Sequence, residues 1–214
     1  MTPRLRKFAL TAHVTSSVGW LGAVATFLAL ALGGLISDDA KIVHAAYLAT
    51  DLITWFVIVP LAFASLLTGL VVSLGTEWGL FRHYWVFVKF MLTILATVLL
   101  LLHTQPIGLL ASAARETTLS GADVGRLQIQ LVADAIAALI ALMVNVTLSV
   151  YKPRGLTAYG RRKLLEKRPN IADTGGDGGR AGLWLKVLAA IVVALVLLFV
   201  ILHLAGRGLG SLHH

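Results

Sequence analysis

Long apolar runs follow one another along this chain, and short polar segments separate them. A helix needs about 20 mostly apolar residues to cross a bilayer. Five runs reach this length, at residues 8–34, 43–74, 84–105, 127–150 and 183–205. The pattern therefore predicts an all-α integral membrane protein, a bundle of five transmembrane helices with a four-helix core and a C-terminal fifth helix.

Two prolines and one mixed segment interrupt these runs. Pro60 lies near the middle of the second run, where the missing backbone donor predicts a kink. Pro106 follows His103 closely, so we expect the third helix to end or bend there. The stretch 107–125 is too mixed to span a membrane and predicts a short interfacial helix.

The composition favours a membrane protein over a soluble one. Of the 214 residues, 58% are hydrophobic and 13% are charged, and the mean hydropathy is +0.87. A soluble domain of this length could not bury so much apolar surface. The absence of cysteine excludes disulfides, thiolate metal sites and cysteine nucleophiles.

Basic residues orient the predicted bundle. Three basic residues precede the first run, one lies in the second connection and eight fall within 151–182. The connections on the opposite side also contain basic residues, but acidic residues there offset their charge. The positive-inside rule then places the N-terminus in the cytoplasm and the C-terminus outside. The first run is too long for a signal-peptide core, so we expect a retained helix. This distribution explains the net charge of +8 without nucleic acid.

The same pattern divides the chain into three parts. Residues 1–150 are the predicted four-helix transmembrane core, 151–182 a basic cytoplasmic linker, and 183–214 the fifth helix with a short extracytoplasmic tail. A basic segment beside a bilayer is typical of contact with anionic headgroups, and a regulatory role is the alternative.

Ionisable side chains within the apolar runs are costly in a bilayer and are usually functional. A rise of about 1.5 Å per residue places His13 and Lys89 at similar depths near the inner boundary, with Asn145 close to that level. On the predicted topology, three further histidines lie near the outer boundary: His44, His103 and His203.

Facing histidines on neighbouring helices are the usual way in which a membrane bundle holds haem b. The outer histidines therefore predict a haem whose iron is bound by two of them, first of all by His44 and His103. His13 is expected to hold an inner haem or to face one from below, so the chain would bind one or two haem b groups. Lys89 would supply a propionate contact or a proton. Interhelical hydrogen bonds are the ordinary structural explanation of the same histidines.

Two acids also fall within the runs. Asp51 lies two turns from His44, and we expect it to pair with the basic partner of a haem propionate, to carry protons or to bond another helix. Asp134, with Gln128 and Gln130, is expected to make interhelical hydrogen bonds. Copper or zinc sites have weaker support, because the spacing HxxxH and methionine clusters are absent from the sequence.

The first run has the form H-x6-W-x-G, at His13, Trp20 and Gly22. In this it resembles the first helix of CopD-like membrane proteins and of the bacterial membrane protoporphyrinogen oxidases. Residues 60–103 look like paired helices of a related, uncharacterised family of bacterial integral membrane proteins. The positions that carry this second likeness are Thr68, Gly69, Tyr84, Lys89 and His103.

The resemblance spans about residues 8–103 and implies a multi-pass protein of the bacterial inner membrane. In the oxidase family the first-helix histidine is associated with haem b, and a third-helix lysine is functionally important. His13 and Lys89 are the matching positions, and Trp20 belongs to the same cofactor-binding motif. The separation of Lys89 from His103 is about one turn longer than in that family, which argues against porphyrinogen oxidation.

The leading hypothesis is a membrane-embedded b-type haem protein that performs electron transfer or haem-linked redox chemistry, with haem-dependent oxidoreductase activity as a candidate. Its expected partners are the lipid bilayer and a quinone or another redox protein, and a homo-oligomer is a candidate assembly. Two alternatives stay open. One is a copper or small-solute transport component of CopD-like type, and the other is a cofactor-free membrane scaffold.

Overall fold

The computed structural model describes residues 2–75, 84–115, 122–151 and 162, and this part of the chain contains helices and no strand. Four helical rods are long and apolar enough to cross a membrane, as a multi-pass membrane protein requires. The predicted fifth helix, 183–205, lies outside the described residues. The elements are α1 (Pro3–Ile36), α2 (Ala40–Ile53), the π-helical turn η1 (Thr54–Ile58), α3 (Val59–Gly75), α4 (Tyr84–Arg115) and α5 (Ala122–Tyr151).

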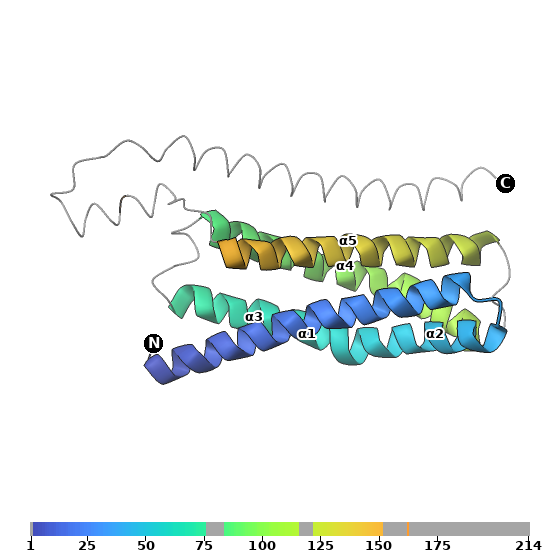
Figure 1. Ribbon diagram of the computed structural model, residues 1–214, viewed down its shortest axis with the longest axis horizontal. Helices are drawn as coiled ribbons and strands as arrows, with labels where there is room; N and C mark the ends of the chain where they lie inside the picture. Colours follow the sequence, from blue (N-terminus) through green and yellow to red (C-terminus); the bar gives the residue numbers. More distant parts are fainter. Residues whose placement is uncertain (1, 76–83, 116–121, 152–161, 163–214) are drawn as a thin grey trace.

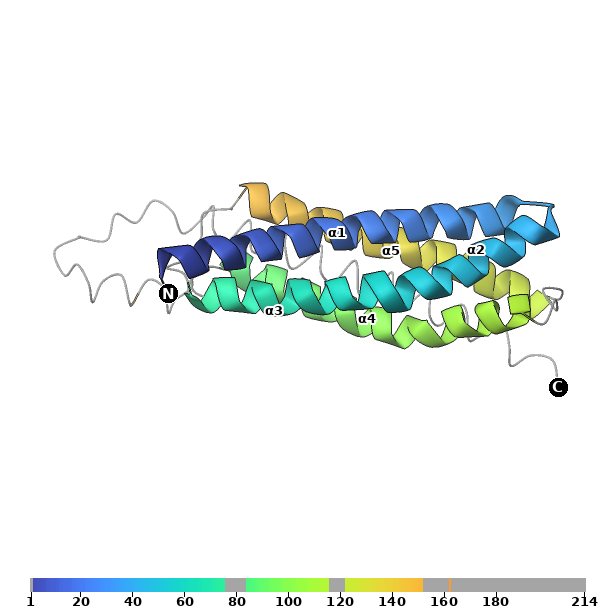
Figure 2. The same ribbon diagram turned by 90° about the horizontal axis from the view of Figure 1, so that it is seen from below.

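The rods alternate in direction and lie side by side in both views (Figures 1 and 2). The N-terminal end of the bundle, as we call it, holds Pro3, Gly75, Tyr84 and Tyr151, and the opposite end holds the connection between α1 and α2. Helix α1 packs against α2, α3 and α5, while α4 packs against α2, α3 and α5. One core of mainly Leu, Val, Ile and Ala, with Trp20 and Phe27, joins these helices.

Side chains cap the first two helices where the chain enters them. Thr2 Oγ1 accepts from the Leu5 amide at 3.4 Å, and Pro3 occupies the first turn of α1, where its missing donor costs nothing. Asp39 Oδ1 accepts from the Lys41 amide at 2.8 Å and begins α2. A turn of only three residues, 37–39, therefore reverses the chain.

A π-helical turn lies next to Pro60, the residue at which a kink was expected. Val59 donates its amide to Thr54 O, five residues earlier, and η1 ends at Ile58, two residues before the proline. A π turn shifts the hydrogen-bond register next to a residue that has no backbone donor. The second predicted run is thus one rod that consists of α2, η1 and α3.

Of the two alternatives at Pro106, an end of the third helix there, with a separate interfacial helix within 107–125, was wrong. Helix α4 contains Pro106 and continues to Arg115. The reason is packing, since four positions at helical spacing after the proline are buried in the bundle: Ile107, Leu110, Ala111 and Ala114. His103 therefore lies about three turns before the end of α4, inside the bundle, whereas the predicted run ended two residues after it.

A close approach between α1 and α2 gives a prediction about stability. A methyl group on Gly34 would lie 2.8 Å from Cζ of Tyr47, whose ring is fully buried. We expect Gly34→Ala to lower the free energy of unfolding by about 1–3 kcal/mol, because a rigid aromatic ring has to move. Denaturation in mixed detergent micelles measures it.

Gly33 provides the matched control. A methyl group there meets no atom within 4 Å, so Gly33→Ala should keep or raise stability by up to about 1 kcal/mol through helix propensity. Equal destabilisation by the two substitutions would show that the contact with Tyr47 is not the cause.

Candidate functional site

A histidine and an aspartate meet in the interior of the bundle. His103 of α4 and Asp134 of α5 place Nε2 and Oδ2 2.9 Å apart, with 11% and 15% of their side chains exposed. His103 Nδ1 lies 2.7 Å from Leu99 O. A carbonyl oxygen only accepts, so Nδ1 carries a hydrogen and donates it. With one further proton, on Nε2 or on the carboxyl group, the two side chains form a pair that is neutral as a whole.

The His103–Asp134 pair opens on a cavity of about 120 Å³ between α1, η1, α4 and α5. Its lining is otherwise mostly Leu, Ala, Val, Ile and Phe, with Thr54 and Trp20 as the other side chains that carry a polar atom. Thr54 uses its hydroxyl hydrogen on Thr50 O at 2.7 Å. An engineered apolar cavity of about 150 Å³ stays dry and binds benzene. The space therefore suits a single six-membered ring.

His13 lies outside this cavity, near the N-terminal end. Its Nδ1 contacts Ser65 O at 3.1 Å and Thr68 Oγ1 at 3.2 Å, both on α3. Gly69 leaves room for the ring, since a methyl group there would be 3.0 Å from His13 Cε1. Ser17 and Ser65 add a hydroxyl contact of 2.8 Å. These contacts join α1 to α3 as interhelical hydrogen bonds do in membrane bundles.

Lys89 and Asn145 lie at the same end, between α4 and α5. Lys89 Nζ donates to Ser149 Oγ at 2.5 Å, and Asn145 Nδ2 donates to Thr93 Oγ1 at 2.9 Å. The Lys89 ammonium is also within electrostatic range of His13. The three residues thus lie at one end, as their predicted depths require, but hydrogen bonds join His13 to α3 and the other two to the α4–α5 interface.

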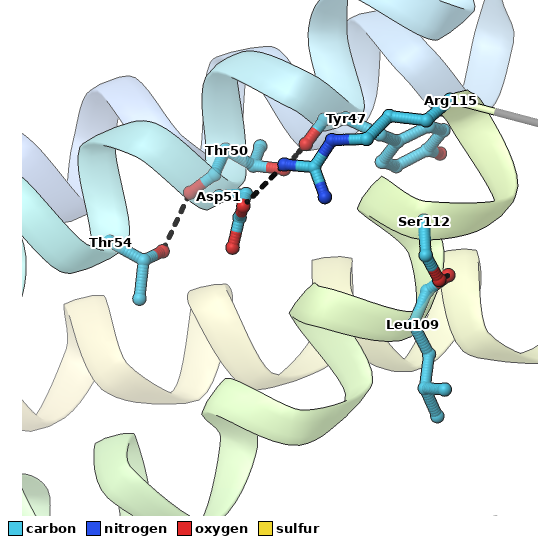
Figure 3. Close-up of polar contacts among 7 residues, drawn as sticks. All are labelled: Tyr47, Thr50, Asp51, Thr54, Leu109, Ser112 and Arg115. Atoms are coloured by element: carbon cyan, nitrogen blue, oxygen red, sulfur yellow. Dashed lines mark hydrogen bonds and ion pairs between the residues drawn. The ribbon is translucent and has the colours of Figure 1, made fainter.

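At the opposite end, Asp51 of α2 accepts from Arg115 of α4 at 3.2 Å (Figure 3). Of the three roles expected for Asp51, the bond to another helix is the one that the structure contains. Arg115 is 59% exposed, so the pair is a solvent-screened contact of modest strength.

His44 and His103 lie at different depths, so they do not face each other. His103 shares the cavity with Thr54, whereas His44 precedes Thr54 on the continuous α2–η1 rod by almost three turns, about 15 Å. Two axial nitrogens need to be about 4 Å apart, because metal–imidazole bonds are about 2 Å long. The depth match predicted for this pair was wrong, since it assumed that α4 ends near His103.

The other predicted site residues are distributed as follows. Trp20 lines the cavity with His103, while His13, His44 and Lys89 do not. His203 lies outside the described residues. Within the described ranges, no group of three or more His, Cys, Asp or Glu side chains could hold a metal ion.

Asp134 is the site residue that sequence reasoning treated only as an interhelical bond. His103 is nineteen residues from the start of α4 at Tyr84, and Asp134 is seventeen from the end of α5 at Tyr151. Counted from the N-terminal end of the bundle, the two residues therefore have nearly equal depth. This count needs the true helix ends, which the apolar runs alone do not provide.

No protein-family model, no curated protein and no solved structure matches this chain. The resemblance to CopD-like proteins stays a prediction.

Proposed function

We propose that this membrane protein binds a small apolar molecule with one hydrogen-bonding oxygen in the cavity, and that the His103–Asp134 pair exchanges a proton with it. The benzoquinone ring of a membrane quinone is the ligand class that we expect. The observation that carries the proposal is one acid–base pair at the wall of an otherwise apolar space.

The size and polarity of the cavity support this ligand class. A volume of about 120 Å³ suits one ring, and the apolar lining suits its methyl substituents. A quinone carbonyl oxygen is an acceptor, and the proton shared by His103 and Asp134 provides the donor. Such a molecule reaches the site from the bilayer, in which it dissolves.

Stability alone explains the pair poorly. A buried ion pair is often no more stabilising than apolar side chains of similar volume, and ionisable groups inside a membrane usually mark ligand or proton sites. The lining between α4 and α5 is otherwise apolar, so leucine at both positions would suit a mere scaffold. Proton exchange with a ligand gives the pair a role that leucine cannot fill.

Haem b fits the described cavity less well. The macrocycle joins four pyrrole rings, and the space accommodates about one ring. His103 Nε2 contacts Asp134, and neither His13 nor His44 lines the cavity. Haem binding stays a prediction for the whole chain, and a pyridine haemochrome assay of protein grown with adequate haem decides it. Elemental analysis for copper tests the transport alternative in the same way.

Fluorescence of Trp20 tests the proposed ligand. Trp20 is 3% exposed and lines the cavity. A variant that keeps Trp20 and carries phenylalanine at the other four tryptophans is titrated in detergent with a tail-free dimethoxy-methyl-benzoquinone. We expect saturable quenching, which His103→Leu weakens by at least about tenfold, a loss of about 1.4 kcal/mol of binding.

The matched control keeps Trp55 as the single tryptophan. Trp55 is 50% exposed on η1 and does not line the cavity, so its quenching should rise linearly as the quinone partitions into the micelle. Linear quenching of Trp20 as well would show that no site exists in the cavity and would favour the scaffold alternative.

A further inference from the structure

Lys89 carries a charge that no acidic group balances within the part of the chain that the structure describes. Its ammonium donates to Ser149 Oγ at 2.5 Å, and no carboxylate of the described residues lies within ion-pair distance of it. An ammonium has three donors. Two N–H donors of Lys89 therefore remain for an acceptor that the described side chains do not supply.

The polar neighbours of Lys89 leave a second group unmatched. Ser149 and Thr93 donate their hydroxyl hydrogens to backbone carbonyls, at 3.0 Å to Asn145 O and 2.8 Å to Lys89 O. Asn145 Nδ2 donates to Thr93 Oγ1, while its Oδ1 is buried with no hydrogen-bond partner among the described residues. The α4–α5 interface thus lacks both an anion beside Lys89 and a donor beside Asn145.

The position of these groups indicates where a ligand would come from. Lys89 and Asn145 are five and six residues from the helix ends at Tyr84 and Tyr151, roughly 8–9 Å from the N-terminal end of the bundle. The titratable group nearby among the described residues is His13, which cannot neutralise a cation. Basic pockets between transmembrane helices on the cytoplasmic side bind anionic head groups, and the positive-inside rule makes this end cytoplasmic.

We propose that Lys89 and Asn145 bind the head group of an anionic phospholipid. A phosphodiester oxygen accepts from Lys89, and a head-group hydroxyl donates to Asn145 Oδ1. Phosphatidylglycerol carries both groups. A soluble phosphate ester such as glycerol 3-phosphate has the same chemistry. The site lies outside the cavity, so it is independent of the quinone proposal.

Native mass spectrometry of the full chain tests the site. The protein is reconstituted in nanodiscs that mix phosphatidylcholine and phosphatidylglycerol, released into detergent, and scored for retained lipid. We expect one phosphatidylglycerol per chain in preference to phosphatidylcholine. Lys89→Gln should retain about five- to tenfold less, as the loss of one lysine contact to an anionic lipid predicts, and Lys89→Arg should retain it.

Lys7→Gln is the matched control, because it removes one positive charge from an exposed residue of the same end. It should retain phosphatidylglycerol like the unmodified protein. If Lys89→Gln does not fold, Asn145→Leu replaces it and should lower retention as well. Displacement by glycerol 3-phosphate identifies a soluble phosphate ester as the ligand, and retention in its presence identifies a lipid head group.

Two results overturn the site. One is retention of phosphatidylglycerol no better than that of phosphatidylcholine by the unmodified protein. The other is equal retention by the folded Lys89→Gln variant and the Lys7→Gln control.

Discussion

Leucine at either member of the His103–Asp134 pair should lower the free energy of unfolding by about 3 kcal/mol, whereas leucine at both should bring it back to within about 1 kcal/mol of the original. His103 Nε2 and Asp134 Oδ2 lie 2.9 Å apart. Each single substitution therefore leaves one buried polar group without its partner. The double substitution removes both groups, and leucine occupies their space in an apolar surrounding. Denaturation of the four proteins in mixed micelles gives the complete cycle.

Asp134→Asn separates the contribution of the hydrogen bond to stability from proton exchange by the acid. His103 Nδ1–H is committed to Leu99 O at 2.7 Å, so Nε2 has a lone pair whenever the ring is neutral. The Asn amide can donate to that lone pair, and Asp134→Asn should cost less than about 1 kcal/mol of stability. It should nevertheless abolish proton exchange, because an amide does not release its proton. Additive effects of the two single leucine substitutions would contradict a direct contact.

The second large effect is expected from filling the cavity. Ala135 lines it and is 5% exposed. Ala135→Leu adds three carbon atoms to a space that suits about one ring, so affinity for the benzoquinone probe should fall by more than about tenfold. Stability should change by less than about 2 kcal/mol in either direction, since added burial is offset by some overpacking. The Trp20 titration and micelle denaturation measure the two quantities.

Ala133→Leu separates occupancy of the cavity from the mere presence of a larger residue on α5. Ala133 is partly buried on the same helix and does not line the cavity. It should leave the affinity for the probe within about twofold, a difference below about 0.5 kcal/mol. Equal losses of affinity in the two variants would place the ligand elsewhere.

The apolar run of the third predicted helix did not reveal where α4 ends. Residues 107–115 mix Ser, Gly and Arg with apolar residues, and their average hydropathy hides the helical spacing of the buried ones. A proline at the start of this stretch added a reason to end the helix. Packing against the bundle outweighs the loss of one backbone hydrogen bond, and packing energy depends on neighbours that a linear pattern does not contain.

The histidine predictions depended on that boundary. Depth was counted from the ends of apolar runs, so an error of about three turns at the end of α4 moved His103 from the middle of the bundle to its edge. His44 was therefore predicted as its partner, although Asp134 occupies the matching depth on α5. At the N-terminal end, the third run began at the true start of α4 and the fourth run ended one residue before the end of α5, and Lys89 and Asn145 do share one interface.

The sequence by itself determined the class of this protein and most of its spans, because burying about 20 apolar residues in lipid is a property of each segment alone. It also determined which polar groups have to be explained, since every charge inside a run is costly wherever it points. Only the tertiary structure decided which of them meet. The continuation of α4 and its packing against α5 set the partner of His103, and both depend on close packing between segments far apart in the chain.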